Sequence, residues 1–101
     1  MSIITGKELK EKLDQGEDVV IIDLREEEDY KKGHIKGAHN MSMSQVSHEI
    51  EDLVEDSDSP ICVYCYSGNR SSKVGTILEF LNYANVYNLK SIDNWSYDLE
   101  K

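Results

Sequence analysis

Three short apolar runs along the chain predict strands that are buried on both faces. They are DVVIIDL at 18–24, ICVY at 61–64 and NVYNL at 85–89. Their apolar residues follow one another instead of alternating with polar ones, which is typical of parallel strands covered by helices on both sides. A weaker run, GAHNM at 37–41, predicts one more short strand.

The first helix is predicted close to the N-terminus. Thr5 and Glu8 form a capping-box pattern, in which each side chain satisfies a free backbone N–H group at the start of the helix. Leu9 and Leu13 then supply one apolar face, and Gly16 ends the helix.

Two more helices are predicted between the first and second apolar runs. Residues 26–32 form a short charged segment that ends at Gly33. Ser44 is then expected to cap a longer helix. Four apolar residues follow it at helical spacing: Val46, Ile50, Leu53 and Val54.

A helix is also predicted after the strand at 61–64, starting at Ser71 or Ser72. Its inward-facing residues are Val74, Ile77, Leu78 and Leu81. Asn82 follows where a left-handed residue commonly ends a helix, and residues 93–99 predict a last short helix. Strands that alternate with helices predict an α/β domain with a central parallel sheet and helices on both faces.

Composition and charge narrow the classes of function. The chain has 101 residues and a formal net charge of -9, which predicts one domain spanning 1–101 and disfavours nucleic acid or an anionic membrane as a partner. No basic, apolar leader and no run of about 18 apolar residues is present. The sequence therefore predicts a cytoplasmic protein.

Two cysteines, Cys62 and Cys65, are too few and too close together for a disulfide framework. The pair spells C-V-Y-C, but a thioredoxin-like redox pair would open a helix, whereas Cys62 lies inside a predicted strand. The three histidines, His34, His39 and His48, match no zinc-ligand spacing, so no metal is expected. Because Cys62 and Cys65 are three residues apart in a strand, their side chains should point to opposite faces, and Cys62 is interpreted as core packing.

The segment CYSGNRS at 65–71 places a cysteine directly after a buried strand and before a helix. Ligands of open parallel sheets bind at the carboxyl ends of strands, where Cys65 is expected. A turn allowed by Gly68 would direct backbone N–H groups and the positive end of the helix at the sulfur, while Arg70 adds a cation. This environment favours a reactive thiolate. A second interpretation, that Cys65 is a small buried hydrophobic residue, stays open on these observations.

Two motifs resemble those of the rhodanese homology domain. DLREEEDYKKGHIKGAHN at 23–40 is similar to the family's first signature, and CYSGNRSS is similar to its active-site loop. The resemblance extends over about residues 3–97 and includes VYNL and a following tryptophan, Trp95. The matching residues of the first signature are Asp23, Arg25, Tyr30, Gly33, His34, Ile35, Gly37, Ala38 and Asn40.

The resemblance implies a rhodanese-like fold and a sulfurtransferase in which Cys65 is the catalytic nucleophile. Sulfane sulfur would pass from a small sulfur-containing anion such as thiosulfate, through a Cys65 persulfide, to cyanide, a thiol or a protein. No cofactor is implied. Asp23 and Arg25 would support the site, Arg25 as a brace for nearby loops, and His34 belongs to the scaffold. The implied substrate-binding residues are Tyr66, Ser67, Gly68, Asn69, Arg70 and Ser71.

Loop length bears on the reaction that the resemblance implies. Sulfur-transferring members have six residues from the cysteine to the end of the loop, as Cys65 to Arg70 do here, whereas related phosphatases have one more. A phosphatase and a non-catalytic interaction module remain as alternatives. The chain also departs from the family, since NLKSIDNW at 88–95 lacks a glycine pair that the family usually has before its last helix. Asn82 replaces another usual glycine and should preserve that turn.

Overall fold

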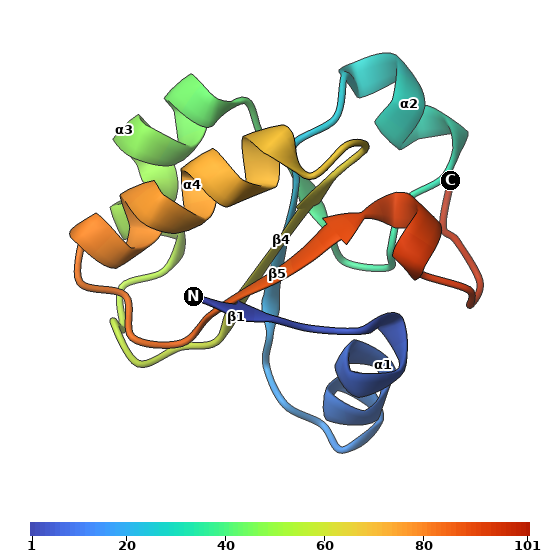
Figure 1. Ribbon diagram of the computed structural model, residues 1–101, viewed down its shortest axis with the longest axis horizontal. Helices are drawn as coiled ribbons and strands as arrows, with labels where there is room; N and C mark the ends of the chain where they lie inside the picture. The colour runs from blue at the N-terminus through green and yellow to red at the C-terminus, as the bar shows by residue number, and fades with distance from the viewer.

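Five parallel strands form one sheet in the computed structural model, which describes residues 1–101 (Figure 1). The order across the sheet is β1-β5-β4-β2-β3, so β4 is central and lies between β2 and β5. Residue Asp23 at the end of β2 pairs in register with Tyr64 of β4, which brings the carboxyl ends of these two strands together. The strands are β1 (Ser2–Ile3), β2 (Val20–Asp23), β3 (His39–Asn40), β4 (Ile61–Cys65) and β5 (Val86–Ser91).

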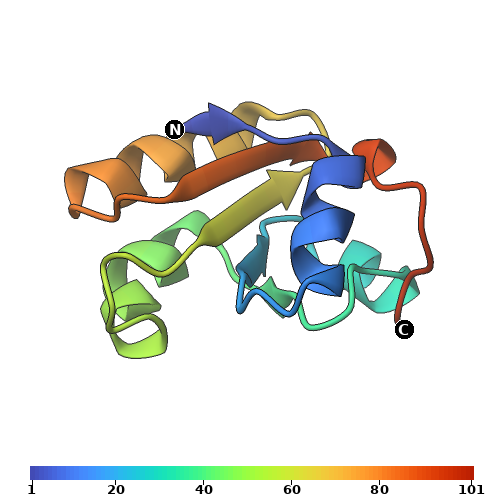
Figure 2. The same cartoon turned by 90° about the horizontal axis from the view of Figure 1, so that it is seen from below.

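Helices cover both faces of this sheet, as Figure 2 shows in a view along the layers. Helices α3 and α4 cover one face, and α1 with the short 3₁₀ helix η1 covers the other. Helix α2 lies beyond the carboxyl end of β2 (Figure 1). This arrangement confirms the predicted α/β class. The helices are α1 (Gly6–Asp14), α2 (Glu27–Lys32), α3 (Met43–Leu53), α4 (Asn69–Phe80) and η1 (Ile92–Asn94).

Each face of the sheet has its own apolar core. The core under α3 and α4 contains Val46, Ile50, Val74 and Leu78 together with Ile22 and Val63 of the sheet. The core on the other face contains Leu9, Ile92 and Trp95 together with Ile21 and Tyr64. The prediction for Leu53 was wrong, because this residue ends α3 and is 38% exposed, while the following Val54 is extended and turns into the core. Ile77 and Leu81 are half-buried instead of fully inward.

The start of α3 differs from the prediction. Ser42, not Ser44, is the N-cap, and its hydroxyl accepts a hydrogen bond from the Gln45 backbone N–H at 3.1 Å. The Gln45 side chain returns the interaction by accepting from the Ser42 N–H at 2.8 Å. Ser44 has no Glu or Gln three residues further on, so it cannot form this reciprocal pair.

Substitution of each serine in turn tests whether Ser42 or Ser44 caps α3. Ser42→Ala removes the capping hydroxyl and should lower the free energy of unfolding by about 1 kcal/mol. Ser44→Ala, inside the first turn, should leave stability almost unchanged. Urea unfolding of both variants measures the difference, and an equal or larger loss for Ser44→Ala would contradict the assigned cap.

The second half of the chain also departs from the predicted boundaries. Helix α4 begins at Asn69, earlier than Ser71 or Ser72, because Gly68 takes a left-handed conformation (φ 89°) that turns the chain directly out of β4. The helix predicted over 93–99 is limited to η1, while β5 continues to Ser91 and β1 was not predicted. Asn82 has the left-handed conformation expected of it (φ 71°). None of the helices combines the length and apolar character that a membrane crossing requires.

Candidate active site

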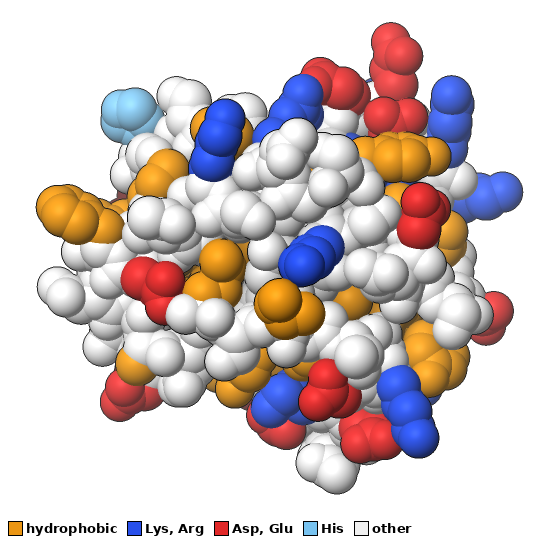
Figure 3. Space-filling view, viewed as in Figure 1, with side chains coloured by type: hydrophobic (Ala, Val, Ile, Leu, Met, Phe, Trp, Pro, Cys, Tyr) orange, Lys and Arg blue, Asp and Glu red, His pale blue; other side chains and the backbone are white.

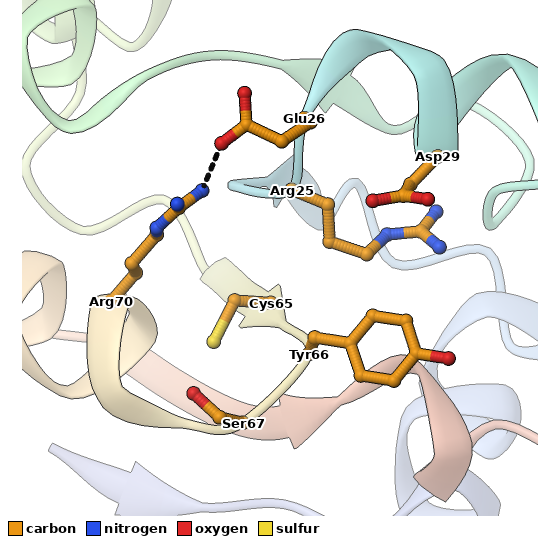
Figure 4. Close-up of a pocket in the computed structure, with 7 residues that line it drawn as sticks. All are labelled: Arg25, Glu26, Asp29, Cys65, Tyr66, Ser67 and Arg70. Atoms are coloured by element: carbon orange, nitrogen blue, oxygen red, sulfur yellow. Dashed lines mark ion pairs between the residues drawn. The ribbon is translucent and has the colours of Figure 1, made fainter.

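A small pocket of about 180 Å³ opens where β2 and β4 end (Figure 4). Cys65, the last residue of β4, lies in it. Loop and helix residues after β4 form one wall, and residues after β2 form the other. The lining residues are Arg25, Glu26, Asp29, Cys65, Tyr66, Ser67 and Arg70.

Hydrogen-bond donors surround the Cys65 sulfur. The Gly68 backbone N–H donates to Sγ at 3.0 Å. Ser71 Oγ lies 3.6 Å from Sγ and accepts from the protonated thiol, while its own hydroxyl donates to the Gly68 carbonyl at 3.2 Å. Burial by itself would raise the pKa of the Cys65 thiol, but the Ser71 hydroxyl and the backbone N–H groups of Ser71, Gly68 and Arg70 outweigh it and lower that pKa below its ordinary value. The early start of α4 is the reason, because it places the N–H groups of the first helical turn next to the sulfur.

One acceptor also lies close to the sulfur. The Lys90 carbonyl oxygen is 3.4 Å from Sγ and accepts a hydrogen bond when Cys65 is a protonated thiol. Lys90 has a left-handed backbone (φ 73°) at the point where the register between β4 and β5 shifts. The segment without the usual glycine pair therefore does border the site, and a lysine takes a conformation that favours glycine.

Removal of the Ser71 hydroxyl tests how much this group lowers the pKa of Cys65. Ser71→Ala should raise the pKa of Cys65 and slow its alkylation by iodoacetamide severalfold near neutral pH, with little change at high pH, where the thiol is ionised in any case. Ser72→Ala is the matched control, because Ser72 is exposed on the same helix and does not contact the sulfur. Equal alkylation profiles for the two variants would show that Ser71 does not act on Cys65.

The implied substrate-binding residues do not all reach the pocket. Tyr66, Ser67 and Arg70 line it. Gly68 and Ser71 are not among the lining residues, but they contact the Cys65 sulfur. Asn69 is exposed, and its backbone N–H donates to the Ser67 hydroxyl at 3.4 Å. Asn69 is not among the residues that line the pocket and makes no hydrogen bond to the sulfur, so its part in binding stays a prediction.

A buried network of polar groups lies behind the pocket. Asp23 is fully buried, and Arg25 Nη2 pairs with its Oδ2 at 2.8 Å while also donating to the Gly33 carbonyl at 2.7 Å. The Tyr64 hydroxyl donates to the same carboxylate at 2.7 Å. Although burial by itself would lower the pKa of Arg25, hydrogen bonding and attraction to Asp23 raise it. Arg25 therefore connects the end of β2 to the loop after α2.

Two other candidate groups lie outside the pocket. Cys62 packs in the core on the opposite face of the sheet from Cys65, and burial raises the pKa of its thiol to about 12. His34 stacks on Tyr30 with ring centroids 3.7 Å apart, and its Nδ1 lies 2.8 Å from the Tyr30 carbonyl. No group of three or more potential metal-ligating side chains occurs in the structure.

The sequence interpretation missed Glu26, Asp29 and Lys90. Glu26 Oε1 pairs with Arg70 Nη1 at 2.9 Å, and the same nitrogen donates to the Leu24 carbonyl at 3.0 Å. A usable signal existed for the two acids, since both follow β2 and the carboxyl ends of adjacent parallel strands meet. Using this signal requires knowing that β2 and β4 are neighbours in the sheet.

These features together describe an α/β protein in which a cysteine that favours the thiolate form lies at the carboxyl end of the central strand. Residues 5–98 match the rhodanese-like domain, and the chain belongs to this family. It is 32% identical over 77 residues to a thiosulfate sulfurtransferase GlpE of Pseudomonas entomophila, a match that covers 74% of this chain and 67% of the relative. The match to thiosulfate sulfurtransferase PspE of Escherichia coli is 34% identical over 67 residues, covering 66% and 64% of the two chains.

Solved structures agree with this assignment. A rhodanese with anions from E. coli has a TM-score of 0.76 at 29% identity, with 82% of this chain and 98% of that chain covered. A rhodanese-like domain protein from Staphylococcus aureus has a TM-score of 0.79 at 30% identity, with 99% and 97% covered. The predicted family is therefore confirmed.

Proposed function

We propose that this protein is a sulfurtransferase that carries sulfane sulfur on Cys65 as a persulfide. The observation that carries the proposal is the set of N–H and O–H donors around Sγ, led by the Gly68 N–H at 3.0 Å. Donors that favour a thiolate also stabilise the negative charge of a persulfide and of the transition states on either side of it. Relatives named as thiosulfate sulfurtransferases support the same reaction class.

The first half of the proposed reaction loads the cysteine. The Cys65 thiolate attacks the outer sulfur of thiosulfate, a bond forms between Sγ and that sulfur, and the donor's S–S bond breaks with its electron pair leaving on sulfite. Cys65 is only 2% exposed, but it lines the pocket of about 180 Å³, and this pocket is the route by which a small anion would approach the sulfur. Arg70, which extends from the start of α4 across the pocket toward Glu26 in Figure 4, is the cation that can hold the oxygen end of the donor.

The second half returns the thiolate. A nucleophilic acceptor such as cyanide or a thiol attacks the outer sulfur of the persulfide, and the electron pair of the breaking S–S bond returns to Sγ. No general base is required, because both nucleophiles react as anions. His34, which is buried outside the pocket, is accordingly given no part in the chemistry.

Mass spectrometry tests the proposal directly. Incubation with thiosulfate should add one sulfur atom to the intact protein, fragmentation of the peptide between Cys62 and Cys65 should place it on Cys65, and cyanide should remove it. The absence of an adduct, or an adduct on Cys62, would contradict the proposal. Hydrolysis of an aryl phosphate that depends on Cys65, without sulfur loading, would support a phosphatase instead.

A further inference from the structure

Both cationic side chains of the Cys65 pocket are already paired with carboxylates. Arg70 Nη1 pairs with Glu26 Oε1 at 2.9 Å, and Figure 4 shows its guanidinium turned toward Glu26, above the level of the sulfur. Arg25 pairs with the buried Asp23 at 2.8 Å. A donor with a doubly charged oxyanion end must therefore compete with Glu26 for the guanidinium of Arg70.

The remaining charge at the pocket is negative. Asp29 also lines the pocket and forms no ion pair, whereas Glu27 of the same helix is paired with Lys31 at 2.8 Å and does not line the pocket. Figure 3 shows acidic side chains at the upper right, where Figure 1 places α2, with basic side chains beside them. This field repels a dianion and attracts a cationic group at the mouth of the pocket.

We propose that Glu26 determines the charge selectivity of the site, so that sulfane-sulfur donors carrying a protonated amine are preferred to otherwise similar anionic donors. The proposal rests on the sulfurtransferase function. Glu26 acts in two ways: its carboxylate occupies Arg70, and it offers an acceptor for an ammonium group. Its side chain is 71% exposed, so it is accessible to a donor in the pocket.

The chemistry is the same for every donor of this class. The Cys65 thiolate attacks the outer sulfur of a thiosulfonate, R–SO₂–S⁻, and a bond forms between Sγ and that sulfur. The donor's S–S bond breaks, and its electron pair leaves on the sulfinate R–SO₂⁻. Charge balances without an added oxidant or reductant. Only the group R differs, so relative rates report how the pocket treats its charge.

Three donors make the comparison. Thiosulfate is a dianion and leaves as sulfite, ethanethiosulfonate is a monoanion and leaves as ethanesulfinate, and 2-aminoethanethiosulfonate is a zwitterion that leaves as the amino-substituted ethanesulfinate. The wild-type protein should show a kcat/KM about threefold higher for the amino donor than for ethanethiosulfonate, which is the size expected of an exposed ion pair. The ratio should shrink with added salt, because exposed charges are screened.

The Glu26→Gln variant should abolish this selectivity. The preference for the amino donor should fall to about one, while kcat/KM for thiosulfate should rise about three- to fivefold through a lower KM, because Arg70 is released. Glu28→Gln is the matched control. It removes the same charge from the same helix, but Glu28 neither pairs with Arg70 nor lines the Cys65 pocket, so both ratios should stay close to the wild-type values.

The outcomes test the selectivity role of Glu26 separately from the sulfurtransferase function. If all three donors load Cys65 but Glu26→Gln leaves their ratios unchanged, or shifts them no more than Glu28→Gln does, the selectivity role of Glu26 is wrong and the sulfurtransferase function stands. If no donor loads Cys65 in the wild-type protein, the function itself is wrong.

Discussion

Replacing Cys65 by serine should lower sulfur transfer from thiosulfate to cyanide by at least about a thousandfold. A serine hydroxyl is not ionised near neutral pH and cannot form a stable persulfide, so the loss should appear in kcat and not only in KM. Thiocyanate formation measures the rate. The variant should remain folded, because serine is close to cysteine in size and donors for its oxygen are already in place around position 65.

The second cysteine supplies the control. Cys62→Ala removes the other thiol of the chain from a core position on the opposite face of the sheet. Its sulfur transfer should stay within about twofold of the wild-type rate, with a modest loss of stability from the lost packing. Turnover that survives Cys65→Ser but disappears in Cys62→Ala would show that Cys62, and not Cys65, carries the chemistry.

The second large effect is expected in stability. Arg25→Met should lower the free energy of unfolding by about 3–5 kcal/mol, because it leaves the fully buried carboxylate of Asp23 without its cation. A domain of this size has a total stability of only about 5–15 kcal/mol, so the variant should unfold at much lower denaturant concentrations. Equilibrium unfolding in urea measures the change.

Two further variants separate the ion pair from its surroundings. Tyr64→Phe removes one hydrogen bond to the same carboxylate and should cost only about 1–2 kcal/mol. The double variant Asp23→Asn with Arg25→Gln replaces the charged pair by a neutral one, so it should be more stable than Arg25→Met. A loss below about 1 kcal/mol for Arg25→Met would show that the pair does not brace this end of the sheet.

Local sequence patterns predicted most of the fold. Continuous apolar runs located the three longest strands, because strands buried on both faces need apolar residues at every position. The two-residue β1 was too short to produce such a pattern. The cap of α3 was placed at the wrong serine although the S-x-x-Q pattern of Ser42 and Gln45 was present, since two serines compete as caps in the segment.

The site was predictable to the extent that it is local. Cys65, Gly68 and Arg70 lie on one strand–loop–helix unit, so their spacing already indicates donors around a thiol. Glu26 reaches Arg70 only because β2 and β4 are neighbours, and sequence patterns do not give strand order. The Lys90 carbonyl lies close to the Cys65 sulfur because the register between β4 and β5 shifts, and no residue type in the sequence predicts such a shift.

The ionisation of Cys65 decides whether this protein holds a reactive thiolate. Iodoacetamide alkylation of the Cys62→Ala variant, followed across pH, reports a single thiol whose reactivity follows the fraction of thiolate. We expect a midpoint below the ordinary cysteine pKa, because the donors around Sγ outweigh its burial. A midpoint at or above that value would mean that burial dominates and that Cys65 is an ordinary core thiol.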